Sequence, residues 1–97
     1  MAEIVLSGRA YSDFKRIWRY IAEDSERAAD QLLLAMDDRI QALAAFPEMG
    51  PTRPEIAPDA RVLIHGGYLI LYAFDPARDL IEIVAIVEGM RDLDRLL

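Results

Sequence analysis

The stretch RVLIHGGYLILYAF, residues 61–74, decides the fold of this chain, because it is typical of two strands joined by a tight turn. Apolar, β-branched and aromatic side chains dominate residues 61–64 and 68–74. The Gly66-Gly67 pair between them supplies the positive φ angles that tight hairpins require. The stretch therefore predicts an antiparallel β-hairpin.

Two further strands are expected on either side of this hairpin. After the turn residues 75–79, a nearly unbroken apolar run covers residues 80–87, with only Glu82 interrupting it. Such a run suits a central strand that is covered on at least one face. At the other end of the chain, residues 3–6 form a short apolar segment that stops at Ser7, and we interpret it as a first, short strand.

Two amphipathic helices are predicted between the first strand and the hairpin. From Ala10 to Ile21 the apolar residues recur at helical steps, with Ser7 as the expected N-cap. Asp24 and Ser25 break the pattern, and a second apolar stripe then runs from residue 29 to residue 46, where Pro47 is expected to end the helix. Because the connection is so short, the helices should form an antiparallel hairpin.

The segment from Pro47 to Asp59 carries four of the five prolines and Gly50, which predicts an ordered loop. The expected order of elements is thus β-α-α-β-β-β. This order defines an α+β class in which a helical hairpin packs on one face of a mainly antiparallel sheet.

Composition limits the size and chemistry of the protein. A chain of 97 residues, 54% of them hydrophobic and 29% charged, fits one compact domain over residues 1–97. The sequence has no Cys, which excludes a disulfide framework, a thiol nucleophile and a thiolate metal site. We expect neither a cofactor nor a metal, because carboxylates scattered without His are typical of solvated surface.

Charge and hydropathy bear on location and partners. The start of the chain lacks a basic n-region, and its apolar stretches fall far below the roughly 20 residues of a membrane-spanning helix, so we expect a cytoplasmic protein. Direct binding of free nucleic acid is not expected, because the net charge is −6 and such affinity comes mainly from Lys and Arg.

Short motifs are spread along nearly the whole chain. They are Leu6-Ser7 with Ala10, Asp13, Ile17 and Tyr20-Ile21; Phe46-Pro47-Glu48-Met49-Gly50; Arg53-Pro54-Glu55; Arg61; and Gly89-Met90-Arg91-Asp92-Leu93. Read together, in this order and spacing, they resemble the ParE branch of the RelE/ParE toxin superfamily. The resemblance implies a toxin of a type II toxin–antitoxin system, made beside a ParD-like antitoxin whose disordered C-terminal segment folds on the toxin.

The resemblance leaves two kinds of target to compare. The ParE branch is associated with poisoning DNA gyrase, whereas the RelE branch cleaves messenger RNA on the ribosome. Cleavage needs a base, an acid and positive charge together. The sequence offers one Lys, on the first predicted helix, and one His, His65, beside the hairpin glycines, while Glu88 stands where many relatives carry His. We therefore expect the toxin to lack a catalytic site and to act by binding a protein target, DNA gyrase.

Two sets of candidate binding residues follow. Target binding is assigned to residues of the proline-rich loop, the hairpin and the end of the chain: Arg53, Glu55, Arg61, Tyr68, Tyr72, Arg91, Asp92, Leu93 and Leu96. Arg61 is expected to project onto an exposed sheet face beside Tyr68 or Tyr72. Antitoxin binding is assigned to the broad apolar arc of the first helix: Phe14, Ile17, Trp18 and Ile21.

Each of these residues also has a structural interpretation. Arg53 and Glu55 would form a local ion pair. The tyrosines would be core residues whose hydroxyl groups contact water. Arg91 with Asp92 would anchor the end of the chain. The alternatives at the level of function are a RelE-like ribosome-dependent endoribonuclease, using Arg61 and Arg91 to stabilise phosphate, and a binding module that lacks toxicity.

Overall fold

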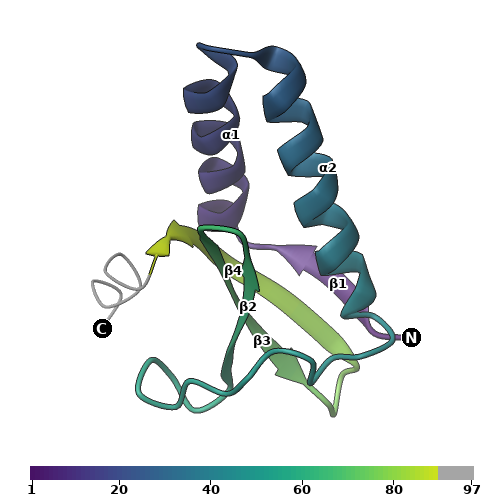
Figure 1. Cartoon of the computed structure of the whole chain (residues 1–97). Coiled ribbons are helices and arrows are strands. Elements are labelled where there is room, and N and C mark those ends of the chain that lie inside the picture. The colour runs from purple at the N-terminus through teal and green to yellow at the C-terminus, as the bar shows by residue number, and fades with distance from the viewer. Residues whose placement is uncertain (90–97) are drawn as a thin grey trace.

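The computed structural model describes residues 1–89, and its elements follow the predicted β-α-α-β-β-β order (Figure 1). The elements are β1 (Glu3–Leu6), α1 (Gly8–Ala22), α2 (Glu26–Ala42), β2 (Ala60–His65), β3 (Tyr68–Asp75) and β4 (Leu80–Glu88). The α+β class is confirmed, because the two helices form a hairpin on one side of a four-stranded sheet.

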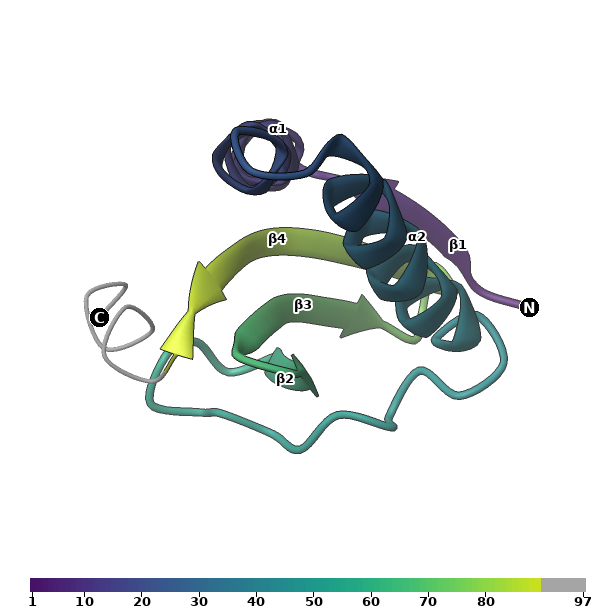
Figure 2. The same cartoon turned by 45° about the horizontal axis from the view of Figure 1, so that its top comes forward.

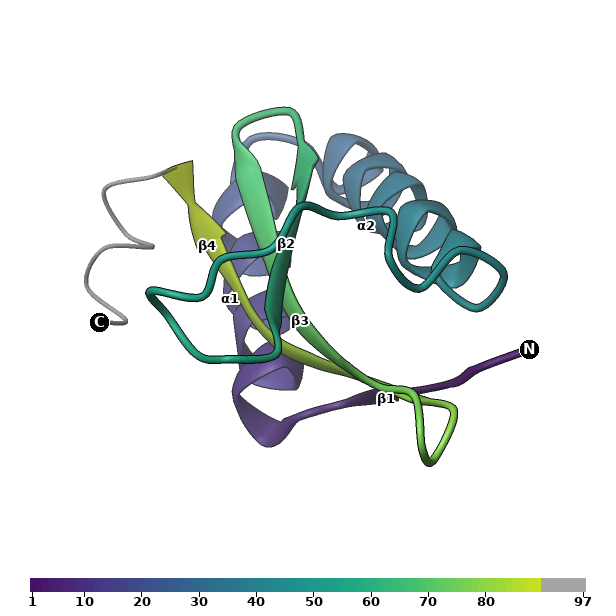
Figure 3. The ribbon, with the colours of Figure 1, turned by 90° about the horizontal axis from the view of Figure 1, so that it is seen from below.

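The strands lie in the order β1-β4-β3-β2. β1 runs parallel to β4, with Glu3 opposite Leu80, while the β4–β3 and β3–β2 pairs are antiparallel. Seen from below, the strands cross one another at the angles of a twisted sheet (Figure 3). The apolar run of residues 80–87 therefore lies in a central strand, as its pattern predicted.

Both predicted N-caps are present. The hydroxyl oxygen of Ser7 accepts from the backbone N–H of Ala10 at 2.9 Å, and that of Ser25 accepts from Ala28 at 3.1 Å. Each bond satisfies a donor that the first helical turn leaves without an intrahelical partner. The expected end of the second helix was wrong, because α2 stops at Ala42 and residues 43–45 form a turn. The apolar periodicity continues through that turn, since Leu43 is buried there.

Each face of the sheet carries its own apolar cluster. The face toward the helices packs against buried residues of α1 and α2, and the cluster is built around Ile17, Met36, Ile40, Leu43, Ile70, Tyr72, Ile81, Ile83 and Ile86. The opposite face holds a second cluster, which Ile56 of the proline-rich loop joins: Ala60, Val62, Leu69, Leu71, Ala85 and Val87. The alternation of the two clusters along β3 follows the period of two expected for a strand.

The helical hairpin extends well past the β2–β3 turn, so its far half has no sheet beside it (Figures 1 and 2). Two polar contacts fix its position. The Trp18 indole nitrogen donates to the Asp30 carboxylate at 2.8 Å and ties α1 to α2, and Arg39 donates to the backbone oxygen of Ile64 at 2.9 Å and ties α2 to β2. Among residues 1–89, no helix has the length and apolar character needed to span a membrane.

Candidate protein-binding site

Hydrogen bonds to an unpaired part of β4 fix the position of the helical hairpin. β1 ends at Leu6, opposite Ile83, so the backbone of β4 beyond Ile83 has no neighbouring strand on that side. Side chains of α1 take its place: the Ser7 hydroxyl donates to the Val84 oxygen at 2.7 Å, and an Asp13 carboxylate oxygen accepts from the Ile86 N–H at 2.9 Å. The start of α1 is thus fixed against the sheet through hydrogen bonds.

Asp13 is the one buried charged residue within the described chain, with 4% of its surface exposed. Two arginines flank its carboxylate, Arg9 at 3.1 Å and Arg16 at 3.4 Å, and Arg16 also lies 3.6 Å from Glu88. Sequence analysis assigned Asp13 no role of its own. The signal was present, because Asp13 falls between Ala10 and Ile17 at steps of three and four, on the buried stripe of an amphipathic helix.

Between the two helices lies a set of partly exposed apolar side chains. We call Phe14, Trp18, Ile21, Leu32 and Leu33 the hairpin surface. Four of them pack against the helix-side core, and Trp18 bridges to Asp30. All five side chains remain partly in contact with solvent.

The expectation that Ile17 belongs to this accessible arc was wrong. Ile17 is 1% exposed and lies in the core between α1 and the sheet. The apolar arc of α1 is broad enough to face two directions, and Ile17 points to the sheet while Phe14 and Ile21 are only partly covered. Periodicity identified the arc, but only the packing shows which of its members face the core.

Tyr72 was also expected on an accessible face, and this was wrong. Its side chain is fully buried on the helix side of the sheet. The phenol oxygen donates to the Pro47 carbonyl at 2.8 Å and accepts from the Gly50 N–H at 2.9 Å, so it anchors the loop that follows α2. Burial raises the pKa of Tyr72, and the bond from Gly50 offsets part of this effect.

Gly50 fits beneath Tyr72 because it has no side chain. A Cβ placed on Gly50 would lie 2.7 Å from the Val62 carbonyl oxygen and 2.9 Å from a ring carbon of Tyr72. Gly50 therefore allows the loop to approach the sheet closely enough for its N–H to reach the phenol. The Phe-Pro-x-Met-Gly motif thus has a packing role beyond ending a helix.

Replacing Tyr72 by Phe should lower the free energy of unfolding by about 1–3 kcal/mol at neutral pH, because the buried Gly50 N–H loses its acceptor. Urea denaturation of the two proteins measures this difference. Tyr11→Phe is the matched control, since Tyr11 is 58% exposed and should change stability little. Equal stability of the Tyr72→Phe variant and the natural chain would contradict the anchoring role.

The same substitution should alter the response to alkaline pH. Because the folded-state pKa of Tyr72 lies above the unfolded value of 10.0, the neutral phenol is favoured by folding. The natural chain should therefore lose stability as the pH rises above about 10, and the Tyr72→Phe variant should lose less.

The remaining described candidates are distributed over the loop and the hairpin. Arg61 lies opposite Tyr72 in the β2–β3 register, but its guanidinium donates to the backbone oxygens of Gly50 at 2.8 Å and Glu48 at 3.1 Å. It thus holds the loop from the helix side of the sheet, and its expected projection onto an exposed face was wrong. Arg53 and Glu55 form the expected ion pair, and the hydrogen bond from Arg53 lowers the pKa of Glu55.

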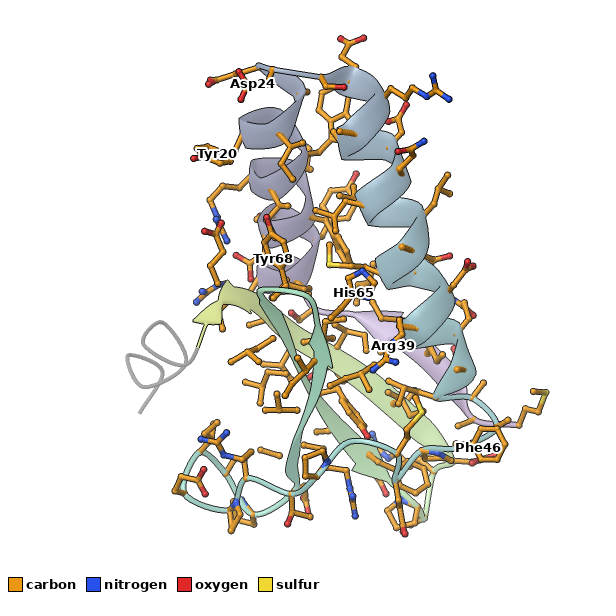
Figure 4. The ribbon with its side chains drawn as sticks, in the orientation of Figure 1. Tyr20, Asp24, Arg39, Phe46, His65 and Tyr68 are labelled. Carbon is orange, nitrogen blue, oxygen red and sulfur yellow. The ribbon has the colours of Figure 1, made fainter. Side chains whose placement is uncertain are left out.

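Tyr68 is partly exposed at the start of β3, opposite His65 at the end of β2 (Figure 4). Burial, followed by the Glu88 carboxylate, raises the pKa of Tyr68. Within residues 1–89, no group of three or more His, Asp or Glu side chains is arranged to hold a metal ion.

Four candidates, Arg91, Asp92, Leu93 and Leu96, lie outside the described residues. The described target candidates lie in two places: Tyr68 at the start of β3, and Arg53 and Glu55 in the proline-rich loop, whose backbone Arg61 of β2 contacts.

The chain is thus a small α+β protein in which a helical hairpin packs against a mainly antiparallel sheet. The chain belongs to the family of ParE toxins: the model described as "ParE toxin of type II toxin-antitoxin system, parDE" matches residues 4–93. The predicted resemblance is confirmed, and the chain is a toxin component of a type II system. A comparison with curated proteins gave no significant match.

Solved structures share the fold at low sequence identity. A chain of the chromosomal ParDE system from P. aeruginosa superposes with a TM-score of 0.75 and 17% identity, over 92% of this chain and 97% of that one. The intact E. coli RelBE toxin–antitoxin complex gives 0.65 and 14%, over 94% and 100%. The isolated E. coli RelE toxin gives 0.65 and 13%, over 100% of both chains. At such identity the likeness concerns the fold alone.

Proposed function

We propose that this protein acts by binding a protein target, without a catalytic step, and that a ParD-like antitoxin neutralises it. The observation that carries the proposal is the match to the ParE family over residues 4–93. The described side chains agree with it, because the Arg61 guanidinium is bonded to the loop backbone.

DNA gyrase is the proposed target. The resemblance to the ParE branch implies it, and the acidic balance of the chain, −6, supports a protein target over free nucleic acid. Gyrase acts on chromosomal DNA, so the toxin would act in the cytoplasm. The described target candidates are Arg53, Glu55 and Tyr68, with Arg91, Asp92, Leu93 and Leu96 proposed from the sequence motif.

The antitoxin is proposed to cover the hairpin surface. A helix whose apolar side chains recur at steps of three and four would bury Phe14, Trp18 and Ile21 against its own apolar face. Apolar surface of this kind is costly to leave in water, and coupled folding of a disordered segment would cover it.

A RelE-like ribonuclease is the second candidate, because the isolated RelE toxin superposes over the whole of both chains. Likeness of fold does not carry the chemistry, which depends on specific side chains. Of the two arginines expected to stabilise phosphate, Arg61 donates to two backbone carbonyl oxygens, and Arg91 lies outside the described residues.

Expression without antitoxin should separate the two functions. We expect thymidine incorporation to fall and a DNA-damage reporter to rise before methionine incorporation falls, because a poisoned gyrase breaks DNA while ribosomes still work. Pulse labelling over the first generation after induction measures the order of events. An early fall of translation with trimmed messages would identify a ribonuclease, and unimpaired growth would identify a binding module without toxicity.

A further inference from the structure

An apolar surface lies at the foot of α2, at the opposite end of the hairpin from Asp24 (Figure 4). Phe46 is 65% exposed and Met49 is 42% exposed, and together with Pro47 and Phe74 they line a hollow of about 580 Å³. We call Phe46, Pro47, Met49 and Phe74 the foot surface. None of the hairpin-surface residues and none of the described target candidates Arg53, Glu55 and Tyr68 lines this hollow.

The foot surface is held in place before any partner arrives. Tyr72 bonds to both Pro47 and Gly50, and Arg61 bonds to the backbone oxygens of Glu48 and Gly50. The Met49 N–H donates to the Phe46 carbonyl at 3.1 Å, which closes the turn that presents both side chains. Because these hydrogen bonds already fix the loop, the foot surface would lose little conformational freedom when it binds a partner.

The rim of the foot surface is acidic. Glu48 lines the hollow itself. Phe74 also lines two adjoining hollows, and these add the carboxylates of Asp59, Asp75 and Glu82 and the guanidinium of Arg61, although Glu82 pairs with Ala73 and so lies on the other face of the sheet from Phe74. The guanidinium is bonded to backbone oxygens, and Asp75 has Arg78 at 3.8 Å. Among residues 1–89, no cation lies within 4.0 Å of the carboxylates of Glu48, Asp59 or Glu82.

We propose that the foot surface is a second docking site, which takes a basic segment of a partner protein. The segment would insert one large apolar side chain between Phe46, Met49 and Phe74 and place flanking Lys or Arg side chains against the acidic rim. Apolar anchors inside a charged rim are the common design of protein interfaces. The proposal stands independently of the gyrase target and of the hairpin surface.

The negative charge around the foot surface favours a basic segment over a second copy of this chain as its occupant. A symmetric dimer through the foot surface would place Glu48, Asp59 and Asp75 of one copy near the same residues of the other, and like charges repel. A basic segment reverses the sign of that interaction. The apolar hollow alone would accept many partners, so the carboxylates supply the specificity.

Fluorescence anisotropy at physiological salt tests the proposal with three labelled peptides and the full chain. One peptide carries a Trp-Leu pair flanked by two Lys on each side, the second replaces Trp-Leu by Ser-Ser, and the third replaces every Lys by Glu. We expect the first peptide to bind at least about tenfold more tightly than either of the others, because binding needs both the anchor and the charge. Methyl NMR should show the Met49 signal shifting as it binds.

Variants at the two ends of the molecule locate the site. Phe46→Ser and Glu48→Lys should each weaken the first peptide by about tenfold. Their matched controls, Leu34→Ser at a 66% exposed position of α2 and Asp24→Lys at the hairpin tip, should not. Equal binding of the Ser-Ser peptide, unchanged affinity of Phe46→Ser, or a dimer of the natural chain that Phe46→Ser dissociates would each overturn the proposal.

Discussion

Replacing Asp13 by Ala is expected to lower the free energy of unfolding by about 2–3 kcal/mol. The Asp13 carboxylate accepts from the Ile86 N–H at 2.9 Å in a buried position, so its removal leaves that donor without a partner. The same change removes the carboxylate on which Arg9 and Arg16 converge. Urea denaturation followed by circular dichroism measures the loss, and hydrogen exchange should show the Ile86 amide exchanging faster.

Controls separate the hydrogen bond from the ion pairs. Asp13→Asn keeps an oxygen acceptor for the Ile86 N–H and should cost less than Asp13→Ala. Arg9→Ala should cost under about 1 kcal/mol, because the arginine side chain is largely exposed and solvent screens its charge. If Arg9→Ala proved as harmful as Asp13→Ala, the charge pair, and not the bond to β4, would hold α1 in place.

The order and type of the elements were predictable from the sequence because local signals agree. Ser7 and Ser25 precede apolar stripes of helical period, and Gly66-Gly67 separates two apolar runs. Each signal acts within a few residues, and the structure confirms each one. The end of α2 was missed because the apolar period continues into the turn, where Leu43 stays buried without being helical.

The accessibility of the candidate site residues could not be predicted in the same way. Tyr72 and Gly50 are 22 positions apart, and only the folded chain shows that the glycine N–H meets the phenol. Likewise, Asp13 and Ile86 are separated by 73 positions. An isolated Tyr, Arg or Asp in a sequence has several possible partners, and packing decides between an exposed contact and a buried anchor. The foot surface was missed because Phe46 was expected to lie in the second helix, whereas α2 ends at Ala42.

The largest effect on partner binding is expected at the hairpin surface. Ile21→Glu should weaken binding of the proposed ParD-like antitoxin by about 30-fold or more, the loss typical of an interface anchor. Ile21 is partly exposed between α1 and α2. In the complex, a carboxylate there would be buried against the apolar face of the antitoxin helix without a partner, which is costly. Isothermal titration with the purified toxin gives the affinity.

Tyr20→Glu is the matched control for this prediction. Tyr20 adjoins Ile21 on the same helix, is 70% exposed, and points away from the hairpin on the outer side of α1 (Figure 4). The same charge one residue away should leave the affinity nearly unchanged, because a helix turns successive side chains to different faces. Urea denaturation of both variants checks that each is folded. Equal loss in the two variants would point to net charge, and no loss in either would place the antitoxin on another surface of the toxin.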